Sequence, residues 1–297
     1  MSIDWEHKLR SFRLKLSESE RTKYKRTFRM IREAIRESPG LESYGASAHV
    51  YGSYRNGTNL RAHSDIDVFV SYDIPRPWDL KPIPKTWRKI GGRTADFLRI
   101  VPDDYARFKE LVGEALVEKF EKKNVQVRRK AIGISKNSSR ISADVIPCFV
   151  YQGSRGALPG IELWSREGDH IIGWPQHHFE KGLAKSRKTE CRYKYMVRAL
   201  KSLKREMEEK ERFEPQRISS YLLECLVYNV PNEKFRTRNY SDSLRNVLSH
   251  LRDGIEHREA WPKWREVHGR RYLVDSNFWR ADRVHAFTDA AWRYVGF

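Results

Sequence analysis

The stretch Val50–Val70 constrains the fold of this 297-residue chain more than any other part of it. It reads V-Y-G-S-Y-R-N-G-T-N-L-R-A-H-S-D-I-D-V-F-V: one apolar run ends at Gly52-Ser53, and a second carries Asp65 and Asp67. Residues i and i+2 of a β-strand face the same side of the sheet. We therefore expect both carboxylates on one side of a strand, with the apolar residues between them directed into the core.

The chemistry of this stretch is that of a site for a metal-bound nucleoside triphosphate. Two neighbouring carboxylates repel each other, and Mg²⁺, which prefers carboxylate oxygens together with substrate phosphates, resolves the conflict. Gly52 allows the backbone to approach a phosphate closely, and Ser53, where a short turn or helix begins, offers a hydroxyl and N–H groups to the β- or γ-phosphate. A lone Asp-x-Asp is usually a solvated surface pair, but the eleven residues between Ser53 and Asp65 make this pattern much more specific.

A third carboxylate on a neighbouring strand would strengthen this interpretation, and Asp144 has the required surroundings. It is the single acid in the run I-S-A-D-V-I-P-C-F-V at 141–150, whose alternation predicts a half-buried strand. A bare charge is costly there. Asp144 therefore either joins Asp65 and Asp67 as a metal ligand or forms an ion pair with an arginine such as Arg128 or Arg140.

Apolar periodicity predicts N-terminal helices, a small sheet and then a helical half. Ser17 is the expected N-cap of a helix that Pro39-Gly40 ends. A helix is expected at 104–122 and a Pro-rich irregular insertion at 73–92, with β-like runs at 47–51, 66–70, 125–134 and 141–150. Beyond Gly160 the pattern becomes mostly helical, with one apolar stripe made of Tyr193, Met196, Val197, Leu200, Leu203 and Met207. We expect an α+β fold with domains at 1–160 and 161–297.

Composition narrows the class of protein. The chain has 58 Lys and Arg against 39 Asp and Glu, and this formal net charge of +19 favours phosphate-bearing partners. The longest apolar stretch, around 221–230, is about half of the roughly 20 residues that a membrane-spanning helix needs. No apolar segment typical of a signal peptide follows the start MSIDWEHKLR. Three cysteines, far apart in the sequence, predict a cytoplasmic protein without a zinc knuckle.

These motifs resemble those of the polymerase-β-type nucleotidyltransferase superfamily. The likeness is closer to one branch, the bacterial cyclic GMP-AMP synthase/DncV-like nucleotidyltransferases (CD-NTases), and within it to clade E, whose members include cyclic UMP-AMP synthases. It runs over nearly the whole chain. The segments that carry it are Y-G-S-Y-R-N-G-T-N at 51–59, R-I-S-A-D-V-I-P-C-F-V at 140–150, S-S-Y-L-L-E-C-L-V-Y-N-V-P-N at 219–232 and the final A-W-R-Y-V-G-F.

The resemblance implies a polymerase-β-like core with a mixed β-sheet and a helical, oligoadenylate-synthase-like C-terminal domain that closes the active-site cleft. It further implies that Asp65, Asp67 and Asp144 hold two Mg²⁺ ions, for which Mn²⁺ is a possible substitute, with Asp144 also a candidate local base. Two nucleoside triphosphates, at least one of them a pyrimidine (UTP with ATP, or UTP with UTP), would form a cyclic dinucleotide with release of pyrophosphate. A separate effector protein would sense this product in anti-phage signalling, and the enzyme would be a monomer that requires neither nucleic acid nor a membrane.

The resemblance assigns further nucleotide contacts to the helical half. Lys201 is expected at the triphosphate, Ser220 at a phosphate and Tyr221 stacked on a base. A structural interpretation of the same residues stays open: Lys201 is solvated, Ser219 or Ser220 caps a helix, and Tyr221 packs in the core. The uracil-using relatives carry Asn where this chain has Lys181, whose ammonium group only donates hydrogen bonds.

Two other functions stay open. One is a template-independent nucleotidyl-adding enzyme that acts on RNA, and the other is a non-catalytic nucleic-acid-binding protein. The intact set of Gly52, Ser53 and the three aspartates argues against a decayed site. His170, His177 and His178 lack nearby cysteines and are interpreted as ordinary loop histidines rather than as zinc ligands.

Overall fold

The computed structural model describes residues 4–12, 16–61, 63–72, 93–151, 160–210, 218–257, 260–275 and 279–297. The chain divides into two compact units. Unit 1 consists of Met1–Lys15, Asn56–His63 and Gln176–Phe297, and unit 2 of Leu16–Arg55 and Ser64–Pro175. Each unit is therefore assembled from segments that are distant in the sequence.

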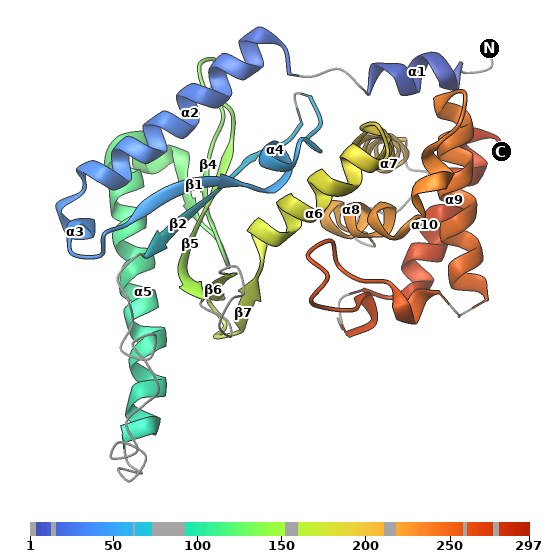
Figure 1. The fold of residues 1–297 in the computed structure, drawn as a ribbon. Coiled ribbons are helices and arrows are strands. Elements are labelled where there is room, and N and C mark those ends of the chain that lie inside the picture. The colour runs from blue at the N-terminus through green and yellow to red at the C-terminus, as the bar shows by residue number, and fades with distance from the viewer. Residues whose placement is uncertain are drawn as a thin grey trace. The chain divides into compact units, whose positions relative to one another are not determined.

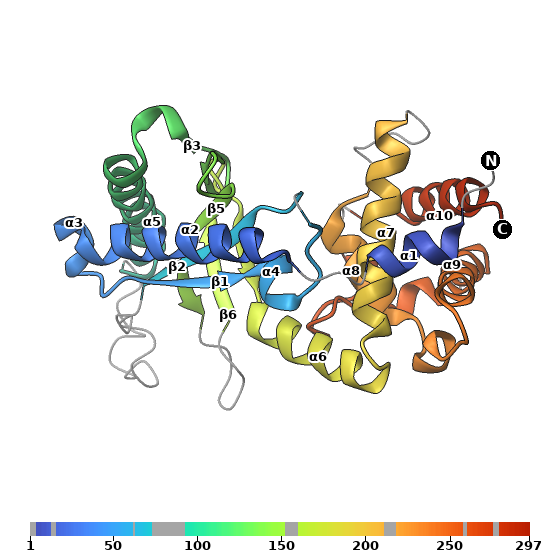
Figure 2. The ribbon, with the colours of Figure 1, turned by 90° about the horizontal axis from the view of Figure 1, so that it is seen from above.

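Unit 2 contains a mixed β-sheet, to which the described residues contribute seven strands (Figures 1 and 2). The strands are β1 (Ser47–Tyr51), β2 (Ile66–Tyr72), β3 (Val125–Val127), β4 (Ile132–Ile134), β5 (Ala143–Tyr151), β6 (Gly160–Trp164) and β7 (His170–Gly173). Their order is β1-β2-β5-β4-β3, with β6 pairing with both β5 and β7. The pair β2–β5 is parallel and the other pairs are antiparallel.

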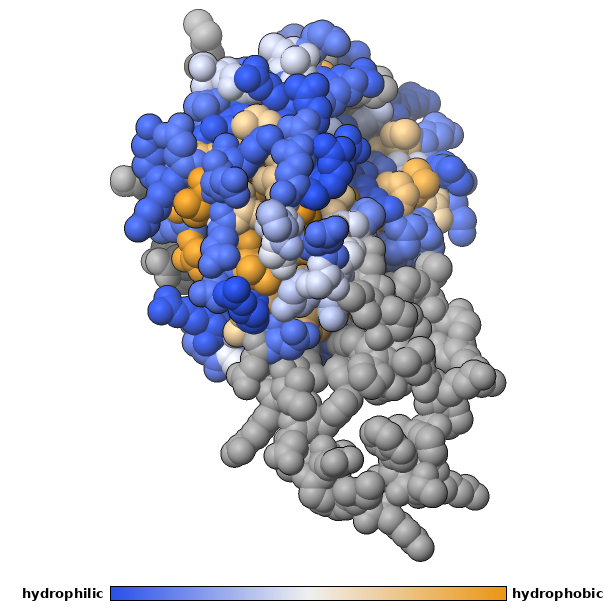
Figure 3. All heavy atoms as spheres, turned by 90° about the vertical axis from the view of Figure 1, so that its left-hand side faces the viewer, coloured by the Kyte–Doolittle hydropathy of each residue, from blue (hydrophilic) through white to orange (hydrophobic). Residues whose placement is uncertain are grey.

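Apart from the short helix at Gly52–Asn56, which buries no residue, the helices of unit 2 pack on the apolar face of this sheet. The unit 2 helices are α2 (Glu18–Glu37), α3 (Pro39–Glu42), α4 (Gly52–Asn56), which ends at the first residue of a unit 1 segment, and α5 (Arg93–Phe120). Ile31 of α2 and Val112 of α5 belong to one core cluster with Val68 of β2, and all three are fully buried. On the side where Figure 1 has α2, α3 and α5, Figure 3 shows a mostly hydrophilic surface, as expected of helices that bury a single stripe.

Helix α2 begins where the sequence predicts. The Ser17 side chain accepts a hydrogen bond from the Glu20 backbone N–H (3.3 Å), and the Glu20 carboxylate accepts one from the Ser17 backbone N–H (2.8 Å). This reciprocal capping box satisfies two backbone donors that the first turn would otherwise leave without partners. The predicted N-cap is confirmed.

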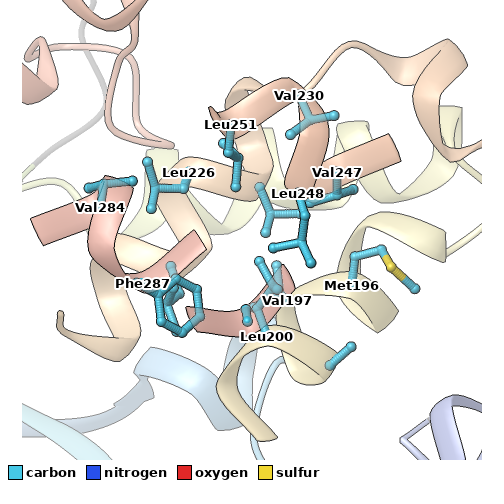
Figure 4. Close-up of a cluster of buried hydrophobic side chains, with 14 of the residues drawn as sticks. Met196, Val197, Leu200, Leu226, Val230, Val247, Leu248, Leu251, Val284 and Phe287 are labelled. Carbon is cyan, nitrogen blue, oxygen red and sulfur yellow. The ribbon is translucent and has the colours of Figure 1, made fainter. Parts of the chain in front are cut away.

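Unit 1 is helical and has its own hydrophobic core. Its helices are α1 (Trp5–Ser11), α6 (Pro175–Lys188), α7 (Arg192–Glu209), α8 (Ser220–Asn229), α9 (Tyr240–Glu256) and α10 (Ala281–Val295). Figure 4 shows side chains of α7, α8, α9 and α10 meeting in this core, among them Val197, Leu226, Leu248 and Phe287. The predicted α7 stripe, from Tyr193 to Met207, is buried along its whole length.

Arg198 of α7 binds two remote segments into unit 1. Its Nε donates to the carbonyl oxygen of Phe12, just after α1 (2.7 Å), and its Nη1 donates to the carbonyl oxygen of Gly57 (2.6 Å). Two further contacts attach α1 to unit 1. Leu9 lies in the core, and the Glu6 carboxylate accepts hydrogen bonds from the first backbone N–H groups of α9. One guanidinium therefore helps to fix two segments that precede most of unit 1 in the sequence.

Some sequence predictions differ from the structure. The run predicted at 125–134 is two short strands, β3 and β4, with a turn at 128–131, and α5 begins before residue 104. Strands β6 and β7 were not expected beyond Gly160, because neither alternates: four successive residues of β6 are buried, and no residue of β7 is buried. The insertion predicted at 73–92 lies outside the described residues.

Two predictions from composition concern membranes and cysteines. None of the helices in the described ranges is long and apolar enough to cross a membrane. Cys148, Cys191 and Cys225 all carry free thiols.

We predict that Arg198→Met lowers the free energy of unfolding by about 2–4 kcal/mol, because two carbonyl oxygens lose a charged donor. Arg198→Lys should recover part of this loss, since an ammonium group can still reach one carbonyl. Urea denaturation followed by tryptophan fluorescence measures the effect. An unchanged denaturation midpoint for Arg198→Met would show that water replaces the guanidinium at no cost.

Candidate active site

The register of β2 against β5 brings two of the predicted aspartates together. Asp67 is the direct partner of Asp144 on the neighbouring parallel strand, while Ile66 pairs with Ala143 and Val68 with Val145. These flanking residues are buried, whereas Asp67 and Asp144 are both half-buried. Because side chains alternate along a strand, both carboxylates leave the face of the sheet opposite the core.

Gly52 occupies a position that no other residue could fill without displacing Asp67. Its φ is +64°, and a Cβ built on it would lie 1.8 Å from Oδ2 of Asp67. Ser53 follows directly on the short helix α4, and Tyr54 stacks on Tyr24 of α2 with ring centroids 5.0 Å apart. The glycine thus allows α4 to begin directly against the Asp67 carboxylate.

Asp65 lies just before β2 and is exposed. The Ser142 hydroxyl donates a hydrogen bond to its Oδ1, and the backbone N–H of Ile66 donates to the Ser142 carbonyl oxygen (3.0 Å). Ser142 immediately precedes β5. Asp65 is therefore fixed at the same end of the β2–β5 pair as the other two aspartates.

Asp144 forms an ion pair with Arg128, one of the two arginines considered from the sequence. Arg128 Nη1 donates to Asp144 Oδ1 at 2.8 Å, whereas Arg140 Nε donates to the Ser135 carbonyl oxygen. Burial raises the pKa of Asp144, Arg128 lowers it and Asp65 raises it, with a net shift upward. The Arg128 guanidinium therefore offsets part of the cost of burying the ionised Asp144 carboxylate.

Gly133 explains how Arg128 reaches Asp144. It is the partner of Asp144 on β4, and a Cβ built on it would lie 2.7 Å from Cζ of Arg128. The arginine side chain therefore crosses β4 over a residue that has no side chain. Any larger residue at 133 would push the guanidinium away.

The type of ligand atom that this site offers, carboxylate oxygen, suits a hard divalent cation. In the described part of the chain, no three His, Cys, Asp or Glu side chains converge as they stand so that they could hold a metal ion. Asp65 is turned to Ser142, and Asp144 to a guanidinium, which takes a cation's place at Oδ1. All three predicted ligands offer carboxylate oxygens, the type that Mg²⁺ prefers, so the residues fit such an ion once these protein donors are exchanged for it.

The remaining predicted residues lie in unit 1, where Lys201 is buried, with 6% of its surface exposed. Its Nζ donates to Glu224 Oε2 (3.2 Å) and lies near both oxygens of Thr58. The solvated interpretation of Lys201 is therefore wrong. Its predicted contact with the triphosphate stays a prediction.

Glu224 is the centre of the cluster that holds Lys201. Its carboxylate also accepts hydrogen bonds from the Thr58 hydroxyl (2.9 Å), from Asn56 Nδ2 (3.3 Å) and from Nε2 of His178 (2.9 Å). Burial by itself raises the pKa of Glu224, but Lys201, His178 and Thr58 outweigh burial and lower it to about 2. The carboxylate is therefore ionised and joins α6, α7, α8 and the 56–63 segment of unit 1.

Ser220 and Tyr221 begin α8. The N-cap is Ser219, whose side chain accepts from the Leu222 backbone N–H (3.0 Å), and Ser220 is exposed. Tyr221 is 39% exposed, so it does not belong to the core. Lys181 is exposed on α6, with its Nζ 2.2 Å from the position that a Cβ of Gly269 would take.

The sequence did not identify Glu224, Glu266 or His268. All three are buried, and their sequence context consists of ordinary helix and loop residues. Glu224 and Glu266 accept hydrogen bonds from other elements, and His268 bonds to Glu266 within one turn. The signal that could have been used is a charged residue within an apolar run, such as Glu224 in Y-L-L-E-C-L-V. The three histidines interpreted as loop residues lie in regular elements instead: His170 is in β7, and His177 and His178 are in α6. His178 pairs with Glu224, and His170 with Glu162 (3.1 Å).

Comparison with known proteins identifies the class to which this fold and site belong. Residues 29–132 match the model of a nucleotidyltransferase domain, and residues 180–296 match that of the cGAS/DncV-like nucleotidyltransferase C-terminal helical domain. The expected core and helical C-terminal domain are confirmed. The sheet of unit 2 therefore belongs to a nucleotidyltransferase domain.

Full-length relatives narrow this class. The chain is 33% identical to a cyclic dipyrimidine nucleotide synthase, CdnE, of Legionella pneumophila over 99% of both proteins. It is 32% identical to a cyclic dipurine nucleotide synthase of Elizabethkingia meningoseptica, over 83% of this chain and 84% of that protein. The structure of the E. meningoseptica CdnE cyclic dinucleotide synthase with GTP and Apcpp has a TM-score of 0.79 and 29% identity, over 98% of this chain and 99% of that one. The chain belongs to the cGAS/DncV-like nucleotidyltransferases, among the CdnE-type enzymes.

We predict that Gly52→Ala reduces product formation by at least about 100-fold, because its Cβ would displace Asp67 and misplace a catalytic carboxylate. Gly45→Ala is the matched control. Gly45 also has a positive φ (+56°), but a Cβ there meets nothing within 4 Å. Both variants carry backbone strain of about 1–2 kcal/mol, and thermal denaturation should show similar losses of stability. Equal loss of activity in both would assign the effect to strain rather than to Asp67.

Proposed function

We propose that this enzyme joins two nucleoside triphosphates into a cyclic dinucleotide, with at least one pyrimidine among its substrates, UTP with ATP or UTP with UTP. The observation that carries the proposal is the pairing of Asp67 with Asp144 beside Gly52, on a chain that aligns over 99% of its length with a cyclic dipyrimidine nucleotide synthase. The product serves as a signal in anti-phage defence and is sensed by a separate effector protein. The enzyme acts as a cytoplasmic monomer and needs no nucleic acid.

Each transfer forms one bond and breaks another. A ribose hydroxyl oxygen of one nucleotide attacks the α-phosphorus of the other, and the bond to the β-phosphate bridging oxygen breaks, so that pyrophosphate leaves with the electron pair. The hydroxyl proton passes to Asp144 or to water. A second transfer of the same kind closes the ring. The chain contributes mainly positioning and charge neutralisation, as expected for phosphoryl-type transfers.

Asp65, Asp67 and Asp144 would hold two Mg²⁺ ions, with Mn²⁺ as a possible substitute. When bound, such ions lower the pKa of the attacking hydroxyl and neutralise the triphosphate and the departing pyrophosphate. Asp144 must then exchange the Arg128 guanidinium for the ion, and Asp65 the Ser142 hydroxyl. Because the guanidinium already balances the Asp144 charge, the exchange replaces one cation with another.

Each unit carries candidate nucleotide contacts of its own. Ser53, next to Gly52, offers its hydroxyl to the β- or γ-phosphate. In unit 1, Ser220 and the ring of Tyr221 stand at the exposed start of α8, where they are available to a phosphate and a base. Lys201 is a candidate triphosphate contact that would have to leave Glu224 or act through the Thr58 segment that it binds.

The first experiment incubates the purified protein with ATP, UTP, GTP and CTP and Mg²⁺, then Mn²⁺, and analyses the phosphatase-treated products by mass spectrometry. A phosphatase-resistant cyclic species is expected, and its mass identifies the bases. If no cyclic species forms in either metal while an RNA primer is extended, the enzyme is a nucleotidyl-adding enzyme instead.

We predict that Asp65→Asn with Asp67→Asn abolishes the cyclic product, a loss of at least about 1,000-fold, while the fold is retained. Asp169→Asn, which removes an exposed acid paired with Arg129, is the matched control and should retain activity. Product quantification and circular dichroism measure the two effects. Near wild-type synthesis by the double variant would sink the metal assignment of the aspartates.

We predict that Lys181→Asn changes the ratio of uridine-containing to other products by at least about threefold in favour of uridine, because an amide can both donate to and accept from a pyrimidine edge. Lys188→Asn removes another exposed lysine of α6 and should leave the ratio unchanged. Competition between equimolar ATP, UTP, GTP and CTP measures the ratio. An unchanged spectrum in Lys181→Asn would remove this residue from the base site.

A further inference from the structure

We infer that Glu266 and His268 are positioning residues that hold the Tyr221 ring outward as a platform for a nucleobase. The inference rests on the proposed function, since it assigns the two residues to the same nucleotide site. Glu266 and His268 lie on the turn at 264–273, which follows α9 in the sequence. No motif pointed to either residue.

Tyr221 has an inverted orientation. A surface tyrosine usually packs its ring against the protein and leaves its hydroxyl in water. Here the residue is 39% exposed, yet its hydroxyl donates to Oε2 of Glu266 at 2.7 Å, and Glu266 is itself buried. Burial raises the pKa of the hydroxyl, and Cys225 and Glu266 raise it further, so the group remains a donor. The polar end is therefore anchored inside, and the apolar ring is presented to the surface.

The anchor is a directed chain of hydrogen bonds. The Arg270 backbone N–H donates to Nδ1 of His268 at 3.1 Å, which leaves the ring proton on Nε2. Nε2 then donates to Oε2 of Glu266 at 2.5 Å, the same oxygen that accepts from Tyr221. His268 need not be charged for this, and burial lowers its pKa despite the neighbouring Glu266.

Glu266 is the charged member of this chain. Burial alone would raise its pKa, but the hydrogen bonds from His268 and Tyr221 outweigh burial and lower it. An ionised carboxylate that accepts two hydrogen bonds on one oxygen holds both donors in fixed directions. The hydroxyl end of the Tyr221 side chain is thereby held at Glu266, which restrains the tilt of the ring.

The turn that carries Glu266 is held firmly to α8, the helix of Tyr221. Asn229 at the end of α8 donates to the Arg265 carbonyl oxygen (2.7 Å) and accepts from its N–H (2.9 Å). Within the turn, the Glu266 N–H donates to the Arg271 carbonyl oxygen, and Leu273 N–H to that of Trp264. Both ends of α8 therefore contact one turn, so that Glu266 cannot move without breaking several hydrogen bonds.

The Tyr221 ring presents an aromatic surface, with the buried His178 ring and the half-buried Trp279 ring packed beside it. The rings of His178 and Trp279 lie 5.4 and 5.6 Å from its centroid. His178 is itself fixed by Glu224, as described above. Because every base has a π-face, such a surface binds nucleobases without selecting among them. Base choice would then depend on edge-reading residues such as Lys181.

The test measures binding of non-hydrolysable UTP and ATP analogues by calorimetry, together with KM and kcat for product formation. Tyr221→Phe keeps the ring and removes the hydroxyl, and Glu266→Ala removes the acceptor. We expect each to weaken analogue binding and raise KM by about 3- to 10-fold, a fraction of what base stacking contributes, with little change in kcat. Glu266→Gln should stay close to the wild type, since one amide oxygen can accept both hydrogen bonds.

Two comparisons make the test specific. Because Tyr221→Phe and Glu266→Ala break the same bond, the double variant should bind no more weakly than either single one. Tyr294→Phe is the matched control: its hydroxyl donates to Glu206 at the same distance, 2.7 Å, away from this turn. It should leave analogue binding and KM unchanged even where it lowers thermal stability.

The outcomes separate this inference from the proposed function. If Glu266→Ala lowers only the melting temperature and leaves analogue binding unchanged, Glu266 is structural and the inference is overturned. The same holds if Tyr221→Ala binds the analogues as the wild type does. If the wild type forms no cyclic product but its analogue binding still depends on Glu266, the platform stands and the synthase function fails.

Discussion

The parallel pairing of β2 with β5 is the constraint on which the active site depends. It makes Asp67 and Asp144 direct neighbours, and a slip of one residue would turn Asp144 into the core and Val145 out of it. Neighbouring carboxylates repel each other, and the fold places a positive charge beside this pair: Arg128 crosses β4 over Gly133 to reach Asp144. Gly52 then admits α4 next to Asp67. The contacts made at Gly52, Gly133 and Arg128 thus all depend on how β2 pairs with β5.

Unit 1 depends on buried charge in a different way. Glu224 and Glu266 are both buried carboxylates that accept hydrogen bonds from distant parts of the sequence, and Glu266 also accepts one from nearby His268. Removing one partner of such a group leaves the other polar and buried, which costs more than the hydrogen bond contributes. Each carboxylate therefore fixes the direction of its partners: Glu224 joins three helices, and Glu266 orients Tyr221. Helix α8 carries both Glu224 and Tyr221, so its position affects both sets of contacts.

Local patterns in the sequence predicted a large part of this structure. Alternation located β1, β2 and β5, the Ser17 capping signal located α2, and the spacing from Ser53 to Asp65 identified the aspartates. The burial of Lys201 was not predictable in this way, because its partners Thr58 and Glu224 are set by tertiary packing and not by neighbours in the sequence. Glu266 was missed for the same reason, because its partner Tyr221 is distant in the sequence. His268, which bonds to Glu266, was missed with it. Strands β6 and β7 were not predicted because their buried and exposed residues do not alternate.

The interleaving of the two units has a consequence for exchange of sequence between relatives. The chain passes between units at residues 15–16, 55–56, 63–64 and 175–176. A chimera that joins the first half of this chain to the second half of a relative would therefore separate α1 and the 56–63 segment from the core on which they pack. Arg198 would face a foreign backbone carbonyl at position 12, and Glu224 a foreign side chain at position 58. Recombination that preserves unit 1 must keep its three segments together, and these flank both segments of unit 2. The two units are therefore expected to be inherited as one block.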